Sequence, residues 1–134
     1  MKQFEIWVAD LPSLPESHIQ HGRRPVIIVS DERVNANNPV VTIVPMTAKG
    51  KRVIIPTHVI LRLPELERPS IALCEHIMPL DKVRLLRRVG YLHGWFEQLS
   101  IQHAISIQLG LAEMCIRDSI YIAFCFHCFC LTGI

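Results

Sequence analysis

Positions 26–29 hold four consecutive β-branched residues, Val-Ile-Ile-Val. Such a run fits a pleated strand that is packed on both faces. Pro25 can open that strand, because the first residue of a strand need not donate a hydrogen bond to the ladder. We therefore expect a buried strand over residues 25–30, around which the rest of the chain is arranged.

Two arginines, Arg23 and Arg24, directly precede this strand. An arginine anchored one residue before a core strand presents a fixed fork of N–H donors, which is the geometry that binds phosphate oxygens in pairs. The simpler interpretation is a solvated strand end, since most arginines beside strands only favour solubility. The spacing alone leaves both interpretations open.

The length and composition indicate one small domain. A chain of 134 residues is near the usual size of a single hydrophobic core, and a hydrophobic fraction of 50% excludes a disordered chain. The formal net charge of +2 is too small to indicate a nucleic-acid-binding protein without local clusters. The first residues lead into an alternating strand pattern that contains Glu5 and Asp10, so we expect no signal peptide, no membrane contact and a cytoplasmic protein.

The composition changes near residue 113, so we divide the chain into a domain over residues 1–113 and a non-native or disordered hydrophobic tail over residues 114–134. Its apolar segment, about 15 residues with a histidine inside, is shorter than the roughly 20 residues that a membrane-spanning helix needs. A metal site is a second alternative, because the tail contains four suitable zinc ligands, although these are crowded together: Cys125, His127, Cys128 and Cys130. Its hexapeptide MCIRDS resembles the translation of a sequencing-library adaptor, so we leave the tail out of the functional interpretation. Amplification of the genomic locus across codon 113 tests that interpretation.

Taken in order, the body of the chain predicts mostly strands. The expected elements are strands over residues 4–10, 25–30, 40–46, 57–61, 70–75 and 87–92, a long loop over residues 11–23, a polar turn over residues 31–39 and a single helical turn over residues 80–86. In the first strand, alternation places Phe4, Ile6 and Val8 on one face. We expect a mainly β fold with one helix, in which five to six antiparallel strands form a small, strongly curved sheet or half-open barrel.

The last predicted element is a helix over residues 95–111 with two apolar stripes at helical spacing. One stripe holds Phe96, Leu99, Ala104, Ile107 and Leu111, and the other holds Ile101, Ile105 and Leu109. Two stripes require two partners. We expect the barrel to cover one stripe, and a second subunit or a groove under a loop to cover the other.

Residue types common in active sites gather in the loop before the central strand, after the next strand and at the end of a later strand. In chain order they are His18, Gln20, His21, Thr47, Lys49, Glu75 and His76. Long loops in compact domains are often functional. The body contains no glycine-rich phosphate loop, paired metal ligands or nucleophile elbow, so the spacing alone indicates only a basic, histidine-bearing face.

Seven sequence blocks, in this order and at these spacings, resemble the MazF/PemK toxin family over residues 3–111. They are EIWVADLP, QHGRRPVIIVS, VVTIVPMTAK, PTHVIL, SIALCEHIMPLDK, RRVGYL and HAISIQLGL. The resemblance implies an SH3-like barrel of the CcdB/MazF type. It also implies a ribosome-independent, sequence-specific endoribonuclease that cleaves single-stranded messenger RNA, inhibits translation and growth, acts as a homodimer and is held inactive by a cognate antitoxin.

The resemblance also assigns site residues. The family's catalytic arginine, which precedes the proline of the core strand, matches Arg24, and its catalytic threonine matches Thr47. The positions that shape the RNA groove in the family match His18, Gln20, His21, Arg23, Lys49, Glu75 and His76. Only Gln20 keeps the family's residue in the segment before Gly22, and His76 stands where the family commonly has glutamine. The cleavage sequence therefore cannot be transferred from relatives.

The implied chemistry needs no metal ion or other cofactor. The 2′-hydroxyl of RNA attacks the adjacent phosphate to give a 2′,3′-cyclic phosphate and a free 5′-hydroxyl, while the protein orients the hydroxyl, neutralises the phosphorane and moves two protons. Arg24 suits the charge, and Thr47 can donate a hydrogen bond to a phosphoryl oxygen. A guanidinium is a poor general base near neutral pH because its pKa lies above about 12. We hypothesise that His18, His21 or His76 supplements proton transfer.

Two other functions remain open, namely a gyrase poison with the same barrel, which would bind through the C-terminal end of its helix, and a purely RNA-binding module. The arginine before the core strand favours the ribonuclease, because a gyrase poison does not need it. We interpret His58 and His103 as structural. The expected partners are single-stranded RNA, an antitoxin with an acidic C-terminal segment, a second copy of the chain, and operator DNA through the toxin–antitoxin complex. We also expect the loop over residues 11–23 to act as a mobile lid on RNA.

Overall fold

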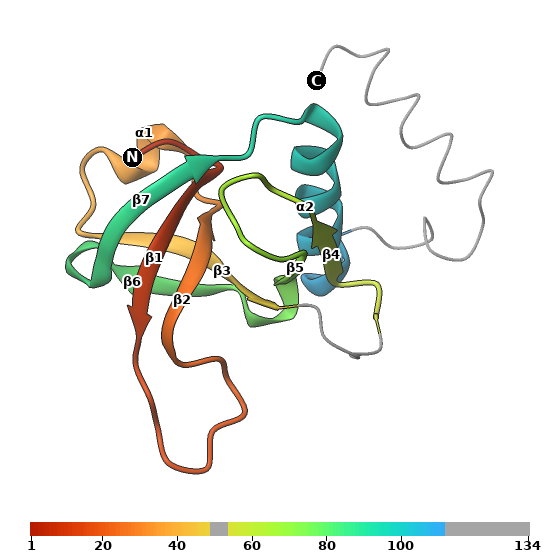
Figure 1. The fold of residues 1–134 in the computed structure, drawn as a ribbon. Helices are drawn as coiled ribbons and strands as arrows, with labels where there is room; N and C mark the ends of the chain where they lie inside the picture. Colours follow the sequence, from red (N-terminus) through yellow and green to blue (C-terminus); the bar gives the residue numbers. More distant parts are fainter. Residues whose placement is uncertain (49–53, 112–134) are drawn as a thin grey trace.

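The computed structural model describes residues 1–48 and 54–111, which form a half-open antiparallel barrel with a helix packed against it (Figure 1). Its seven strands are β1 (Glu5–Leu11), β2 (Gly22–Ile28), β3 (Val40–Ala48), β4 (His58–Leu61), β5 (Ser70–Leu73), β6 (Met78–Asp81) and β7 (Leu85–Tyr91). The helices are α1 (Glu32–Asn35) and α2 (Trp95–Gln108), with two 3-10 turns, η1 (Cys74–His76) and η2 (Lys82–Arg84). The expected fold class is confirmed, with seven strands rather than five to six.

β3 joins the two parts of the sheet. The strand order is β4-β5-β3-β2-β1-β7, and β6 pairs with β3 outside this path. The first half of β3 pairs with β6 and its last three residues pair with β5, while β2 pairs with its other edge. β6 escaped the sequence analysis because its four residues, Met-Pro-Leu-Asp, are too few to show a period and include a proline.

β2 is buried on both faces, as the β-branched run predicts. Ile27 packs in the core cluster that also contains α2 residues, whereas Val26 and Ile28 pack in a second cluster on the opposite face of the sheet. The strand begins at Gly22 rather than at Pro25, because the ladder with β1 continues through both arginines. Arg24 therefore lies within the sheet and not before it, which corrects the expected boundary.

The alternation expected in the first strand holds, although Val8 is less buried than Phe4 and Ile6. Phe4 and Ile6 pack in one core cluster, and Trp7, Ala9 and Leu11 pack in the cluster on the other face, whereas Val8 is only half-buried. The register of β1 against β7 shifts twice, the second time between Val8 and Ala9. The extra residues lie on β7, because β1 pairs with β2 without a break, so β1 keeps its period of two.

α2 contacts β4 and η1 along one face (Figure 1). The buried stripe consists of Ile101 and Ala104 with Ile105 beside them, and it combines members of both predicted stripes. Phe96 and Leu111 of the first predicted stripe are 64% and 75% exposed, so the barrel does not cover that stripe as a whole. The helix also ends earlier than expected, at Gln108.

Three short elements replace predicted turns and strand ends. α1 lies inside the predicted polar turn and is capped by Asp31, whose side chain accepts a hydrogen bond from the backbone N–H of Arg33 at 2.8 Å. η1 takes the place of the expected end of the strand over residues 70–75, because the ladder stops at Leu73. η2 occupies only the middle of the predicted helical turn over residues 80–86, and β7 follows it at once.

The remaining expectations about chain organisation fall outside the described residues. These include the tail over residues 114–134, its alternative zinc ligands and Lys49. Within residues 1–48 and 54–111, no helix has the length and apolarity to cross a membrane.

Candidate functional site

Arg24 and Thr47 are brought together at one end of the β2–β3 pair. Nη1 of Arg24 donates a hydrogen bond to Oγ1 of Thr47 at 3.3 Å, and both residues are half-buried. The two residues are 23 positions apart in the chain. The resemblance predicted this pair, and the structure brings its members into contact.

Strand register explains the contact. β2 and β3 pair Val26 with Pro45 and Ile27 with Val44, so the same antiparallel register continued by two residues places Arg24 opposite Thr47. The buried run of β2 fixes this register, because a slip by one residue would move its apolar side chains to the wrong faces.

The backbone of the loop between β1 and β2 holds the other side of the guanidinium. Nε of Arg24 donates to the backbone carbonyl of His21 at 2.8 Å. Gly22, the residue after His21, has φ of 79°, a conformation that glycine adopts without the steric cost of a Cβ. The chain can therefore turn sharply at Gly22 and bring the His21 carbonyl back to the arginine.

A second contact ties the same loop to η1. The backbone N–H of Gln20 donates to Nδ1 of His76 at 3.3 Å. Both residues are half-buried. The family resemblance implied that both residues belong to the site, but nothing in the spacing joined residues that are 56 positions apart.

Glu75 is held by two residues of the β4 region. Its Oε2 lies 2.6 Å from Nε2 of His58, and its Oε1 accepts from the hydroxyl of Thr57 at 3.3 Å. The side chain of His58 is only 5% exposed, against 24% for that of Glu75. We expected His58 to be structural, and nothing in the sequence connected it with Glu75, because only the β4–β5 pairing brings them together.

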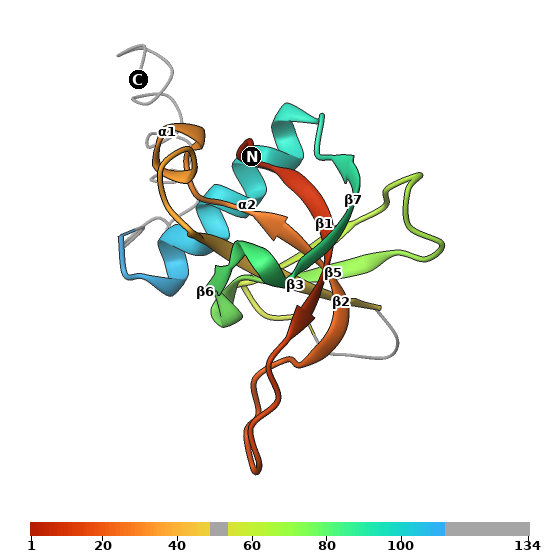
Figure 2. The ribbon, with the colours of Figure 1, turned by 90° about the vertical axis from the view of Figure 1, so that its left-hand side faces the viewer.

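The other predicted site residues lie on the surface. His18, His21 and Arg23 are exposed, and Arg23 stands opposite Asp10 of β1 in the ladder. Among the described residues, the side chains of His18 and His21 make no hydrogen bond or ion pair, and His21 bonds to Arg24 only through its backbone carbonyl. The loop that carries both histidines projects away from the barrel in both views (Figure 1 and Figure 2).

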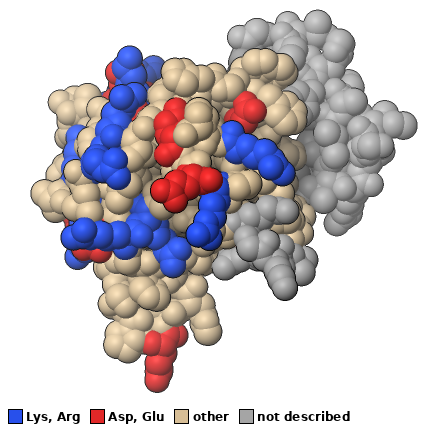
Figure 3. Space-filling model, in the orientation of Figure 1, with Lys and Arg blue, Asp and Glu red and all other residues tan. Residues whose placement is uncertain are grey.

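Basic side chains gather on neighbouring strands. Arg23 and Arg24 lie on β2, Arg87 and Arg88 lie on β7, and β1 runs between these two strands. Figure 3 shows Lys and Arg side chains along the left and lower parts of this face, with Asp and Glu nearer its centre. Arg88 is partly neutralised by Glu5 at 3.6 Å. This distribution favours an anionic partner on the β1–β2–β7 side of the molecule.

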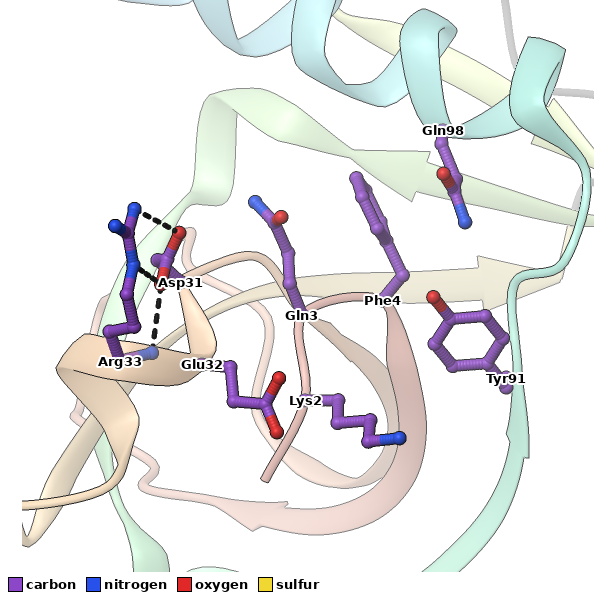
Figure 4. Close-up of a pocket in the computed structure, with 8 residues that line it drawn as sticks. All are labelled: Lys2, Gln3, Phe4, Asp31, Glu32, Arg33, Tyr91 and Gln98. Atoms are coloured by element: carbon purple, nitrogen blue, oxygen red, sulfur yellow. Dashed lines mark hydrogen bonds and ion pairs between the residues drawn. The ribbon is translucent and has the colours of Figure 1, made fainter.

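A hollow of about 450 Å³ lies at the opposite end of β1 and β2 from Arg24 (Figure 4). It is lined by Lys2, Gln3, Phe4, Asp31, Glu32, Arg33, Tyr91 and Gln98. Asp31 and Arg33 neutralise each other there, and the hydrogen bonds from Arg33 lower the pKa of the Asp31 carboxyl. The hollow brings together no catalytic grouping, so we assign the functional site to Arg24 and Thr47.

The residues that the structure describes contain no group of three or more His, Cys, Asp or Glu side chains placed to hold a metal ion. Arg24, Thr47 and the nearby loop residues offer hydrogen-bond donors, which suit an anion better than a cation.

Cys74, the first residue of η1, is predicted to be chemically inert. The side chain is fully buried, and burial followed by the nearby charge of Glu75 raises the pKa of its thiol to about 12. At about pH 8 the reactive thiolate is then on the order of one part in ten thousand. Iodoacetamide should leave Cys74 unmodified in the native protein and modify it after denaturation, as measured by mass spectrometry of the peptide that contains it. Equal labelling rates in the native and denatured protein would contradict the assigned burial.

A half-open antiparallel barrel with one packed helix and an arginine–threonine pair at a strand end defines a small β-barrel protein equipped to bind an anion. The chain belongs to the PemK-like, MazF-like toxins of type II toxin–antitoxin systems, whose family model matches residues 2–103. It is 34% identical over 113 residues to Endoribonuclease MazF of Staphylococcus saprophyticus, covering 83% of this chain and 92% of that protein.

Solved structures show the same fold. The Mycobacterium tuberculosis toxin MazF-mt6 aligns with a TM-score of 0.67 and 25% identity over 80% of this chain and 97% of that one. An endoribonuclease from a mycobacterial species, solved in complex with its cognate antitoxin, aligns with a TM-score of 0.68 and 24% identity over 83% of this chain and 96% of that one. The barrel type expected from the sequence blocks is therefore confirmed.

Proposed function

We propose that this toxin is a metal-independent endoribonuclease that cleaves single-stranded RNA. The observation that carries the proposal is the hydrogen-bonded Arg24–Thr47 pair, with the arginine also held by the His21 carbonyl. The relative that shares 34% identity bears the name Endoribonuclease MazF, which supports the same activity here. An RNA strand is long and is bound along an open surface, so an enclosed cavity is not required.

The donors of the pair suit the reaction. A guanidinium has five N–H groups, and the two contacts described use one on Nε and one on Nη1. Three N–H groups of Arg24 therefore remain for the negative charge that develops on the phosphorane. Thr47 accepts from Arg24 through its oxygen, so its own hydrogen is free for a phosphoryl oxygen.

The proposed reaction is an internal transfer. The 2′-oxygen forms a bond to phosphorus, the bond from phosphorus to the 5′-oxygen breaks, the 2′-hydroxyl proton leaves and the 5′-oxygen gains a proton. The products are a 2′,3′-cyclic phosphate and a 5′-hydroxyl. The loop histidines His18 and His21 are our candidates for assisting these proton transfers, because they lie on the segment that also holds Arg24.

Incubation of the protein with single-stranded RNA in excess chelator tests the proposal. We expect fragments whose 5′ ends accept phosphate from polynucleotide kinase without prior phosphatase treatment. A substrate with 2′-deoxyribose at every cleavage position should stay intact, because it lacks the attacking hydroxyl. Intact RNA at high protein concentration would exclude the nuclease and favour the gyrase-poison or RNA-binding alternatives.

We further propose that the toxin acts in the cytoplasm as a homodimer and is neutralised by an antitoxin with an acidic segment. The exposed aromatic side chains of α2, including Trp95 at 70% and Phe96 at 64% exposure, offer apolar surface for a second subunit. The arginines of β2 and β7 offer positive charge for the acidic segment, so its affinity should fall as salt rises. A monomer at micromolar concentration in sedimentation would remove the dimer proposal.

Contact with operator DNA through the complex is part of the same proposal and is tested by gel shift with and without antitoxin.

A further inference from the structure

Two consecutive loop residues connect His76 to Arg24. The N–H of Gln20 donates to Nδ1 of His76 at 3.3 Å, and the carbonyl of His21 accepts from Nε of Arg24 at 2.8 Å. The backbone between these two contacts is a single peptide link. Any movement of the Gln20 end is therefore transmitted to the carbonyl that orients the guanidinium.

The 3-10 turn η1, which carries His76, is anchored in the core. η1 begins at the fully buried Cys74, and Ile77 closes the turn by donating to the Cys74 carbonyl at 3.3 Å. The next residue, Glu75, is bonded through both carboxylate oxygens to Thr57 and His58. Because η1 is anchored in the core and the loop projects into solvent, the loop is the part that moves when their contact breaks.

The contact requires one protonation state of His76. An imidazole nitrogen accepts a hydrogen bond only through a lone pair, so acceptance at Nδ1 places the hydrogen of the neutral ring on Nε2. The doubly protonated ring carries N–H on both nitrogens. It would face the Gln20 N–H with another N–H, and the contact would be lost.

The charged surroundings of His76 come from a few elements. Glu75 lies on the same turn, and the elements packed against η1 are α2, β3 and β4. β3 contributes no titratable side chain, whereas the others contribute His58, Glu97 and His103. The loop and β2 add His18, His21, Arg23 and Arg24.

We infer that His76 is a positioning residue for the RNA cleavage reaction, which in its neutral form holds residues 20–21 in the place that orients the Arg24 guanidinium. This inference rests on the proposed ribonuclease function. Arg24 acts on the phosphorane at a defined geometry, and a misplacement of about 1 Å can cost on the order of 100-fold in rate. Protonation of His76 is then expected to lower kcat rather than RNA affinity, because added positive charge favours RNA binding.

The test compares His76→Asn, His76→Ala and the wild type at saturating RNA between about pH 7.5 and pH 5.5. Asn places an amide oxygen where Nδ1 lies but does not gain a proton in this range. We expect His76→Asn to keep kcat within about threefold of wild type at pH 7.5 and to show a flatter pH profile, whereas His76→Ala loses about 10-fold to 100-fold at every pH. His93→Asn is the matched control, because His93 is exposed and its ring packs against Tyr91 instead of the loop.

Three results would overturn the inference in an active wild-type protein. They are equal pH profiles for wild type and His76→Asn, a kcat of His76→Ala equal to wild type, and inactivity of His76→Asn at all pH values, which would make His76 a catalytic group instead. Long-range nitrogen NMR of the His76 ring gives an independent readout that needs no activity. We expect the Nε2–H tautomer at pH 7.5, and the Nδ1–H tautomer would contradict the inference. An inactive wild type with the expected tautomer would instead reject the proposed function.

Discussion

Arg24→Ala is expected to lower the rate of RNA cleavage by about two to four decades while leaving the fold intact. In the proposed reaction the guanidinium supplies the N–H donors that meet the phosphorane, and its half-buried side chain adds little to either core cluster. Thr47 keeps its place, because β2 and β3 are paired by backbone bonds and buried side chains that the substitution does not touch. The measurement is single-turnover cleavage of a single-stranded substrate, with circular dichroism as the check on folding.

Two further variants sharpen this prediction. Arg24→Lys retains the charge but not the planar fork, so it should recover only part of the lost rate. Arg23→Ala removes the same charge from the exposed neighbour, and we expect it to raise KM while kcat stays within a few fold. A near wild-type rate in Arg24→Ala together with an inactive Arg23→Ala would move the catalytic role to Arg23.

Ile27→Ala is expected to reduce the free energy of unfolding by about 2 to 5 kcal/mol. Ile27 is 0% exposed and lies near the end of β2, where it pairs with both β1 and β3. Its side chain packs in the cluster that includes Ile101 and Ala104 of α2, so truncation leaves a cavity between the sheet and the helix. A small domain commonly has about 5 to 15 kcal/mol of stability, and a loss of this size is a large share of it.

Ile60→Ala is the matched control for this prediction. Ile60 lies on the edge strand β4 and is 39% exposed, so the same truncation should cost less than about 1 kcal/mol. Urea unfolding of both variants and the wild type, with the slope of the transition compared as well as its midpoint, gives the free energies. Equal losses in the two variants would show that β2 is not the centre of the core.

The loop between β1 and β2 was predicted from the local sequence pattern, whereas its contact with η1 was not. Its prolines and its lack of period predicted a long loop, and the structure has residues 12–21 between the two strands. The expectation that it closes on RNA stays a prediction. The structure adds that the end of the loop nearest Arg24 is tied to η1 through Gln20, so any closing motion must either keep or break that bond.

The sequence by itself determined the parts of this protein that depend on local composition and order. The β-branched run predicted a strand buried on both faces. Side chains branched at Cβ favour a strand, and a strand with apolar side chains on both faces is favourable only where both faces are covered. The ordered blocks indicated the family and, through it, the pairing of Arg24 with Thr47. The predicted strand boundaries were less accurate. Gly22 and Arg23 were expected in the loop and Arg24 just before the strand, but the ladder with β1 places all three in β2.

Only the tertiary structure decided which polar groups meet. The bulges of β7 against β1, the buried stripe of α2 and the bonds of Glu75 to His58 and of Gln20 to His76 leave no periodic trace in the sequence. A period reports which face of an element is apolar, whereas these contacts depend on how whole elements cross and on the register between them. Glu75 and His58 meet because β4 pairs with β5, and His76 meets Gln20 because the end of the loop before β2 lies against η1. The orientation of the Arg24 guanidinium is therefore a property of the assembled barrel and not of the stretch of chain that carries it.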